Sequence, residues 1–319
     1  MTSSTISCTP ARSDTTNSEI SPVLPRIGVV GLGNMGRALT SSLLTRGFAV
    51  SVFSRSQAPL GELEKQGAQK VSSISALGAC NVLFSSLSDD DALESVTSQK
   101  GGLLDSLAPG ALHISTSTVS PEISRRLSQA HDSRQQQFVA APILGNPDLV
   151  QSQRMFVLLS GHAQACEKAR VILEPIALRI ILLGQDPGAA NLMKLACNVL
   201  TASTLQSMGE VIALLRKAGM DEQIAFDIFT STMFDGRVHK SYGGKIVQQR
   251  YRPAGMVIPL AQKDLRLALQ EARNLEVPMP TTSLVHDRLG AAVDKGWSAL
   301  DWSALGALAA VEAGLDTNV

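Results

Sequence analysis

A glycine loop between a short apolar run and an amphipathic segment constrains the fold of this chain more than any other feature. Residues 26–30 (RIGVV) are mostly apolar and β-branched, which predicts a buried parallel strand. The next residues, GLGNMG at 31–36, match the GxGxxG pattern, and residues 34–46 carry apolar side chains at helical spacing. An ordinary strand–helix turn is the alternative. The order of strand, glycine loop and helix predicts the first unit of a dinucleotide-binding α/β fold.

Each position of this loop has a predicted task. Gly31 permits the tight turn, Gly33 lets the backbone approach a pyrophosphate, and Gly36 lets helix and strand pack closely. The helix that begins there offers unpaired N–H groups to the phosphates. The predicted cofactor-binding loop therefore comprises Gly31, Leu32, Gly33, Asn34, Met35 and Gly36.

The end of the second strand predicts which dinucleotide is bound. Proteins that select NAD place Asp or Glu about 20 residues after the glycine loop, where the carboxylate holds the ribose 2′-hydroxyl. This chain has Ser54, Arg55 and Ser56 there instead. An arginine between two hydroxyls can hold a 2′-phosphate through charge-assisted hydrogen bonds, although a solvated loop arginine is the alternative. The sequence therefore favours NADP.

Alternating strand and helix patterns continue to about residue 187 and then stop. This alternation predicts right-handed βαβ units in a doubly wound, mostly parallel sheet. From residue 188 a helix with no breaker except Gly209 is predicted to run to 217, and only helices follow. We therefore predict a Rossmann-type α/β domain at 26–187 and an all-helical domain for substrate binding and dimerisation at 188–319. After the first strand and helix, the predicted strands are 48–53, 81–87, 111–115, 137–140, 155–160 and 179–183, and the predicted helices are 58–66, 90–98, 121–135 and 163–173.

Composition and charge argue against several classes of function. The 28 basic residues balance 28 acidic ones, so no overall field attracts nucleic acid or an anionic membrane. No run of residues is apolar enough to span a bilayer. The four cysteines lack metal-ligand spacing, which predicts reduced thiols, no metal site and a cytoplasmic location. Residues 1–25 are rich in Ser and Thr without an apolar core, which predicts a disordered leader rather than a secretory signal, with a weak organelle-targeting peptide as the alternative.

Two further groups of polar residues are candidates for the chemistry. Ser117 and Thr118 follow the predicted strand at 111–115, at the edge where open α/β sheets bind ligands, although turn chemistry is the alternative. Asn191, Lys194 and Asn198 are spaced i, i+3 and i+7, so they share one face of the long helix. A lysine between two amides, opposite the cofactor domain, is suited to donate a proton; a surface lysine is the alternative.

Four motifs in this order resemble those of the β-hydroxyacid dehydrogenase family, which includes 3-hydroxyisobutyrate dehydrogenases and glyoxylate/succinic semialdehyde reductases. The resemblance extends over about residues 26–315. The motifs are GLGNMG at 31–36, STVSP at 117–121, NLMKLACN at 191–198 and QKDL at 262–265.

The resemblance implies roles for particular residues. Lys194 is implied as the catalytic residue, with Ser117 and Asn198 in contact with the substrate. The residues implied to contact the cofactor are Leu87, Ser88, Thr118 and Lys263.

The stretch 141–147 (APILGNP) departs from the family pattern. Family members commonly have two glycines here, whose backbone amides receive the substrate carboxylate, whereas this chain has Gly145 followed by Asn146 and Pro147. Proline has no N–H, so the donors offered to the substrate change. We expect Gly145, Asn146 and Asn191 to contact the substrate.

A segment of the helical domain, residues 233–245, is predicted to close over the site. Tyr242 and His239 are candidates to line it, with packing or surface roles as the alternatives. The apolar helical domain carries few charges, which predicts a homodimer.

These features predict an NADPH-dependent oxidoreductase that transfers a hydride between the nicotinamide and a small aldehyde acid, keto acid or 3-hydroxyacid. Lys194 donates the proton to the developing alkoxide and accepts it in the reverse reaction. An imine reductase is the main alternative: such enzymes usually lack the family lysine, but Asn146 and the apolar stretch 255–260 keep it open. A nucleotide-binding protein without catalysis is a further alternative.

Overall fold

A nine-stranded sheet forms the first half of the described chain, which comprises residues 25–56 and 60–319 in this computed structural model. The strand order is β3-β2-β1-β4-β5-β6-β8-β7, and β9 pairs with β8. The pairs from β3 through to β6 are parallel, whereas β8 runs antiparallel to both β6 and β7. The expected doubly wound, mostly parallel sheet is therefore confirmed. The expected leader at 1–25, apart from Pro25, lies outside the described residues.

The strands lie where the sequence predicts them, with two additions. The additional strands, β3 and β7, have only two residues each, too few to show a pattern of their own. The bounds are β1 Ile27–Val30, β2 Val50–Phe53, β3 Gln69–Lys70, β4 Val82–Ser85, β5 Leu112–Ser115, β6 Gln137–Ala140, β7 Ile143–Leu144, β8 Met155–Gly161 and β9 Ala177–Leu182.

The three central strands bring the functional loops to one edge of the sheet. All residues of β1, β4 and β5 are buried, as expected for parallel strands covered on both faces. Their register pairs Val30 with Ser85, and Ser85 with Ser115, so the three strands end level with one another. The loops that follow them therefore lie side by side at the carboxyl edge, where open α/β sheets bind ligands.

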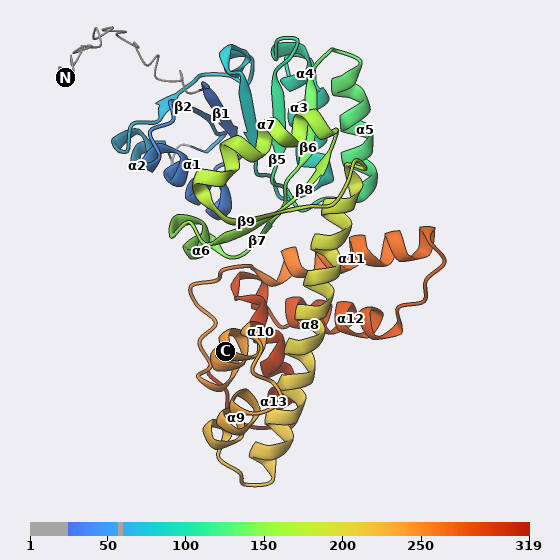
Figure 1. Cartoon of the computed structure of the whole chain (residues 1–319). Helices are drawn as coiled ribbons and strands as arrows, with labels where there is room; N and C mark the ends of the chain where they lie inside the picture. The colour runs from blue at the N-terminus through green and yellow to red at the C-terminus, as the bar shows by residue number, and fades with distance from the viewer. Residues whose placement is uncertain (1–24, 57–59) are drawn as a thin grey trace, which may run out of the picture.

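Helices pack on both sides of this sheet (Figure 1). The predicted helices at 90–98 and 163–173 have exactly these bounds, and the one predicted at 121–135 is shorter at its end. The short helices α4 and α6 were not predicted. The bounds are α1 Asn34–Thr45, α2 Leu60–Lys65, α3 Asp90–Ser98, α4 Leu103–Ser106, α5 Pro121–Asp132, α6 Pro147–Gln151 and α7 Ala163–Leu173.

The second half is built around α8, Gly188–Lys217, which has the bounds predicted from the sequence. In Figure 1 this helix runs from the sheet through the length of the helical half. A Cβ on Gly209 would lie 2.2 Å from the Gly306 carbonyl oxygen, so glycine lets the 302–307 turn pack on the helix. Among the described residues, no helix combines the length and apolarity needed to cross a membrane. The remaining helices are α9 Glu222–Ser231, α10 Arg237–Val247, α11 Ile258–Asn274, α12 Pro280–Asp294 and α13 Leu308–Glu312.

An ion pair fixes the junction between the two halves. The Arg125 guanidinium of α5 donates to both Asp186 carboxylate oxygens, at 2.9 and 2.8 Å. Asp186 also accepts a hydrogen bond from the Gly188 backbone N–H at the start of α8. The start of α8 is thereby hydrogen-bonded to Asp186, which Arg125 ties to α5.

Candidate active site

A cavity of about 280 Å³ lies between the two halves of the molecule. The first half contributes the loops at 33–35, 86–88 and 116–118 together with Ile143 and Gly145. The helical half contributes Lys194 and Asn198 of α8, the segment 254–257, and Leu260, Lys263 and Asp264 of α11. Residues of all four sequence motifs therefore line this one cavity.

The glycine loop has the geometry needed to receive a pyrophosphate. A Cβ on Gly36 would lie 1.9 Å from the Gly31 carbonyl oxygen, and Gly31 itself has a φ of +90°. A Cβ on Gly33, by contrast, would meet no protein atom within 4 Å. Gly31 and Gly36 are therefore required by the packing of the loop, whereas the space beside Gly33 is open to a ligand. This fits the phosphates of a dinucleotide at the start of α1.

Hydrogen bonds connect the two neighbouring loops and α11. The buried Ser117 hydroxyl accepts a hydrogen bond from the Leu87 backbone N–H at 2.9 Å. The Lys263 ammonium of α11 donates to the Ser88 carbonyl oxygen at 2.9 Å and also to the Thr118 carbonyl oxygen. The residues that the family resemblance implies as cofactor contacts, Leu87, Ser88, Thr118 and Lys263, thus lie together. Lys263 reaches them from the other half of the molecule.

Lys194 lies half-buried on α8 and lines the cavity. Burial lowers the pKa of its ammonium below the ordinary value, the Asp264 carboxylate opposes that shift, and the positive charge of Lys263 adds to it. A lysine with a lowered pKa exchanges its proton more readily near neutral pH. The arrangement therefore suits proton transfer.

Asp264 is a site residue that we did not single out from the sequence, although it belongs to the QKDL motif. Its side chain is buried, and one carboxylate oxygen accepts a hydrogen bond from the Asn198 amide at 2.6 Å. The other oxygen lies 2.9 Å from the Lys263 ammonium. Asp264 thus joins α11 to α8 and holds the amide of Asn198 beside Lys194.

Three of the expected substrate residues, Asn191, Tyr242 and Asn146, do not line the cavity. Asn191 is completely buried; its amide oxygen accepts from the Val119 backbone N–H and its amide nitrogen donates to Ser124. Tyr242 packs edge-on against Trp302, with ring centroids 5.5 Å apart. The helical spacing places Asn191 on the same face of α8 as Lys194. Near Asn191, however, that face packs against the first half of the molecule.

The expected departure at 145–147 also has a structural explanation. Gly145 lines the cavity, whereas the Asn146 side chain accepts from the Leu149 backbone N–H and caps α6, with Pro147 as the first residue of that helix. Asn146 therefore lies just outside the cavity, at the edge of an adjoining groove.

The residues expected at the cofactor ribose lie away from the cavity. Arg55 and Ser56 are exposed after β2, and the Ser54 hydroxyl accepts from the Ser56 backbone N–H at 3.2 Å. Leu32 is buried in the core beneath the glycine loop. Within the described ranges, no group of three or more His, Cys, Asp or Glu residues could hold a metal ion.

Two family models together match nearly all of the chain from residue 26 onward. One describes the NAD binding domain of 6-phosphogluconate dehydrogenase and matches residues 26–184. The other describes NAD-binding of NADP-dependent 3-hydroxyisobutyrate dehydrogenase and matches residues 188–309.

Individual proteins are similar over the same region. An uncharacterized oxidoreductase of Bacillus subtilis, YfjR, is 32% identical over 88% of this chain and 98% of its own length. Glyoxylate/succinic semialdehyde reductase 1 of Arabidopsis thaliana is 30% identical over 88% of this chain and 96% of its own length. A solved structure of 3-hydroxyisobutyrate dehydrogenase from Salmonella typhimurium matches with a TM-score of 0.80 at 22% identity, covering 88% of this chain and 98% of that one. This last likeness confirms the fold class.

Proposed function

The chain belongs to the 3-hydroxyisobutyrate dehydrogenase family of NAD(P)-binding oxidoreductases, and from this premise we propose that it uses NADPH to reduce a small aldehyde acid or keto acid to the hydroxy acid. The observation that carries the proposal is the position of Lys194. Its side chain lines the same cavity as Leu87, Ser117 and Thr118, which belong to the other half of the molecule. A proton donor and a cofactor-binding edge therefore border one space.

Lys194 supplies the proton in this reaction. NADPH, when bound, supplies a hydride to the carbonyl carbon of the substrate. The Lys194 ammonium donates a hydrogen bond to the carbonyl oxygen and transfers its proton there as negative charge develops. In the oxidative direction the neutral amine takes the hydroxyl proton. Asn198, held by Asp264, orients the substrate beside Lys194.

The preference for NADP rests on the residues after β2. No carboxylate occupies positions 54–56, and the exposed Arg55 offers a guanidinium where a ribose 2′-phosphate would lie. The Ser54 and Ser56 hydroxyls on either side add hydrogen-bond donors. These residues favour a phosphate over a free hydroxyl.

Replacement of Lys194 by methionine tests the catalytic role. We expect Lys194→Met to lower kcat by about 10² to 10⁴-fold, because the general acid is removed while the apolar stem is kept. The dissociation constant for NADPH, measured by its fluorescence, should stay close to that of the wild type. The exposed Lys295→Met is the matched control and should keep full activity. A Lys194→Met enzyme with near wild-type turnover would refute the assignment.

Turnover assays with NADPH and either carbonyl acids or cyclic imines separate the alternative functions that the sequence leaves open. An imine reductase would reduce cyclic imines faster than carbonyl acids, and a nucleotide-binding protein without catalysis would bind NADPH but turn over neither. We expect turnover of carbonyl acids, because Lys194, Ser117 and Asn198 all border the cavity.

The helical half also supports an assembly of two chains. Large apolar side chains are exposed on α8, where Leu200 is 70% and Leu214 68% exposed, and an apolar hollow of about 350 Å³ lies between α8 and α9. Exposed apolar patches of this kind mark protein interfaces. We propose that a second copy covers them, so the mass in solution should be twice 33.7 kDa. Leu200→Glu should shift it toward the monomer.

We further propose two domains, 26–187 and 188–319, and a cytoplasmic location. The change from sheet to helices at the start of α8 supports the division. The free thiols of Cys80, Cys166 and Cys197 support a reducing compartment.

A further inference from the structure

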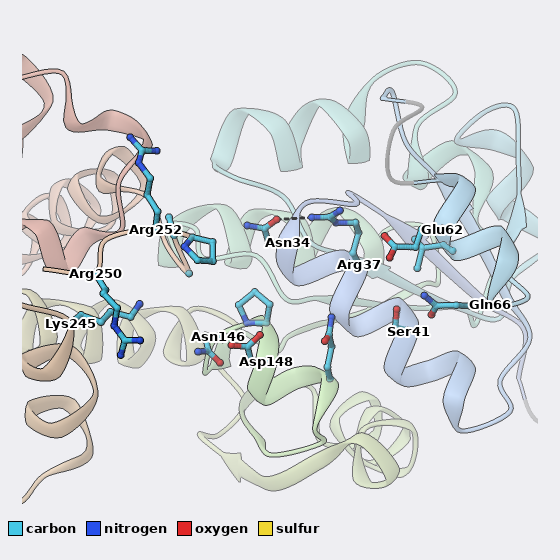
Figure 2. A pocket seen from close by; sticks show the side chains of 16 residues that line it. Asn34, Arg37, Ser41, Glu62, Gln66, Asn146, Asp148, Lys245, Arg250 and Arg252 are labelled. Carbon is cyan, nitrogen blue, oxygen red and sulfur yellow. Dashed lines mark hydrogen bonds between the residues drawn. The ribbon is translucent and has the colours of Figure 1, made fainter. Parts of the chain in front are cut away.

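A second, larger space adjoins the candidate active site. This basic groove, of about 560 Å³, is lined by Arg37, Asn146, Asp148, Lys245, Arg250 and Arg252, among others. Figure 2 shows that α1, α2 and α6 form one side and the helical half forms the other. The groove and the cavity share Asn34, Ala254 and Gly255 as lining residues. The two spaces are therefore neighbouring parts of one cleft between the halves.

Positive charge in the groove exceeds negative charge. Four cations line it, Arg37, Lys245, Arg250 and Arg252, against the carboxylates Glu62 and Asp148. Lys245 is already paired with Asp301, at 3.0 Å. Across residues 25–56 and 60–319, no carboxylate forms an ion pair with Arg37, Arg250 or Arg252. Three guanidinium groups thus border the groove without a carboxylate partner, which suits an anion.

A buried carboxylate fixes the wall between the groove and the cavity. Asp301 is completely buried and accepts a hydrogen bond from the Gly255 backbone N–H at 2.9 Å as well as from the Lys245 ammonium. Its other oxygen accepts from the Ser303 backbone and hydroxyl. The segment that carries Arg250, Arg252 and Gly255 is therefore held in a defined place beside the catalytic cavity. The position of the cations relative to Lys194 is set by the fold.

The place of the groove points to the substrate rather than to the cofactor ribose. Ser54, Arg55 and Ser56 do not line it. It joins the cavity along the lining residues that the two spaces share, Asn34 at the start of α1 and Ala254 and Gly255 in the helical half. A molecule bound at Lys194 that is longer than the cavity would extend along Ala254 and Gly255 into the groove.

We propose that the substrate carries a second anionic group, a carboxylate, phosphate or phosphonate, which binds in the basic groove near Arg250 and Arg252 while the reacting carbon lies at Lys194. This inference rests on the proposed function and narrows it from small carbonyl acids to those with a distal anion. The pair of arginines determines specificity and takes no part in proton transfer. A neutral or short substrate would fill the cavity alone and leave the groove hydrated.

A matched set of substrates tests the inference. The diacids are 2-(hydroxymethyl)alkanedioates in which the methylene spacer grows by one carbon at a time. Their controls are the half-amides, in which the distal carboxylate becomes a carboxamide of the same shape, and a parallel arm carries a distal phosphonate. Oxidation with NADP⁺ is followed by NADPH absorbance. We expect the best diacid or phosphonate to exceed its half-amide in kcat/KM by about tenfold or more, and the ranking of the two arms identifies the anion.

Variants locate the effect. The double variant Arg250→Gln/Arg252→Gln should lose this preference, with the kcat/KM of the half-amide changed by less than about twofold. The exposed Arg273→Gln on α11 is the matched control and should keep it. The wild-type preference should also fall as ionic strength rises, because salt screens partly exposed charges. Unchanged thermal unfolding midpoints show that the variants are folded.

Other results would overturn the inference. Equal turnover of diacids and half-amides by the wild type, or a preference that survives in the double variant, would refute the distal anion site. A raised KM for NADP⁺ with an intact diacid preference would assign the groove to the cofactor. If the wild type oxidised none of these compounds and no simple hydroxy acid, the proposed function would fail. In that case, calorimetric binding of diacid and half-amide to the NADP⁺-loaded protein would test the anion site in the groove without relying on turnover.

Discussion

The two halves of the molecule build their sides of the cleft by different means. The first half uses backbone: Gly31, Gly33 and Gly36 shape a loop at the end of β1, and the spacing of three glycines in one short stretch sets its geometry. The helical half uses side chains: Lys194 and Asn198 on α8 meet Asp264 on α11, 66 positions away from Asn198 in the sequence. One side of the site is therefore local in the sequence, and the other depends on tertiary packing.

Among the substitutions that test this difference between the two halves, Gly36→Ala should have the largest effect. The added Cβ would lie 1.9 Å from the Gly31 carbonyl oxygen, so α1 must move away from the loop. We expect the free energy of unfolding to fall by about 3 kcal/mol, as for overpacking in a core. Urea unfolding of wild type and variant measures it.

Gly33→Ala is the matched substitution in the same loop. Its Cβ would meet no protein atom within 4 Å, so we expect the unfolding midpoint to stay unchanged. The affinity for NADPH should nevertheless fall by about tenfold or more, because the methyl group occupies the space the pyrophosphate approaches. Equal loss of stability in both variants would contradict the separate roles of the two glycines.

The same contrast explains how much the sequence could predict. The strand, glycine loop and first helix, and the full length of α8, follow from local pattern: apolar runs, glycine spacing and the absence of helix breakers. Helical spacing also places Asn191 and Lys194 on one face of α8. It does not state what each end of that face packs against, so the structural contacts of Asn191 with Ser124 could not be foreseen.

Residues that act through distant partners were missed for the same reason. Asp264 was visible only as part of a motif, because its partner Asn198 belongs to another helix. The basic groove is lined by Arg37 from the first half and by Lys245, Arg250 and Arg252 from the second, and no local sequence pattern predicts it. The two-residue strand β7 is likewise fixed by its pairing with β8.

A second difference between the halves concerns buried histidines. His113 and His131 lie completely buried in the first half, whereas residues 188–319, all of which the structure describes, hold no buried histidine. His131 Nδ1 lies 2.8 Å from the Gln136 amide oxygen, and its Nε2 lies 3.0 Å from His113 Nδ1. Because Gln136 donates its amide hydrogens to Leu104 and Leu107, its oxygen accepts from His131. His131 Nε2 then accepts from His113, and His113 Nε2 lies 2.8 Å from the Ser85 hydroxyl, so every ring nitrogen has a partner while both rings are neutral.

These histidines should make the protein lose stability in weak acid. Burial lowers the pKa of His131 to about 4 and that of His113 well below its usual range. The unfolded chain, with a histidine pKa near 6.5, therefore binds protons before the folded chain does. Stability is complete above about pH 6.5 and is lost as the pH falls toward 4. For His131 alone the free energy of unfolding should drop by about 2 kcal/mol between about pH 7.5 and pH 5.

Urea unfolding at both pH values measures this drop. His131→Gln should reduce the pH dependence, and the exposed His162→Gln should leave it as in the wild type. An unfolding free energy that is independent of pH in this range would show that the histidines are not the acid-sensitive element.

A smaller effect is expected in the side-chain half of the site. Asp264→Asn removes the charge that holds the Asn198 amide and that opposes the lowering of the Lys194 pKa. We expect kcat/KM to fall roughly tenfold to thirtyfold, the loss of one charge-assisted hydrogen bond. The pKa of Lys194 should fall further, so the limb of the pH–rate profile that reports it should move to lower pH. A merely structural role would lower the rate without moving that limb.

The smallest effect should come from a side chain of the first half, Arg55. Arg55 is exposed after β2, so its hydrogen bonds to a 2′-phosphate compete with water and are worth about tenfold in selectivity. Arg55→Gln should lower kcat/KM for NADPH by that factor and leave the value for NADH unchanged, since NADH has no phosphate there. NADH serves as the internal control, because a general disturbance of the loop would lower both values. If the ratio of kcat/KM for NADPH to kcat/KM for NADH did not change, the first half would discriminate between the two cofactors through its backbone. The two halves would then differ more than proposed.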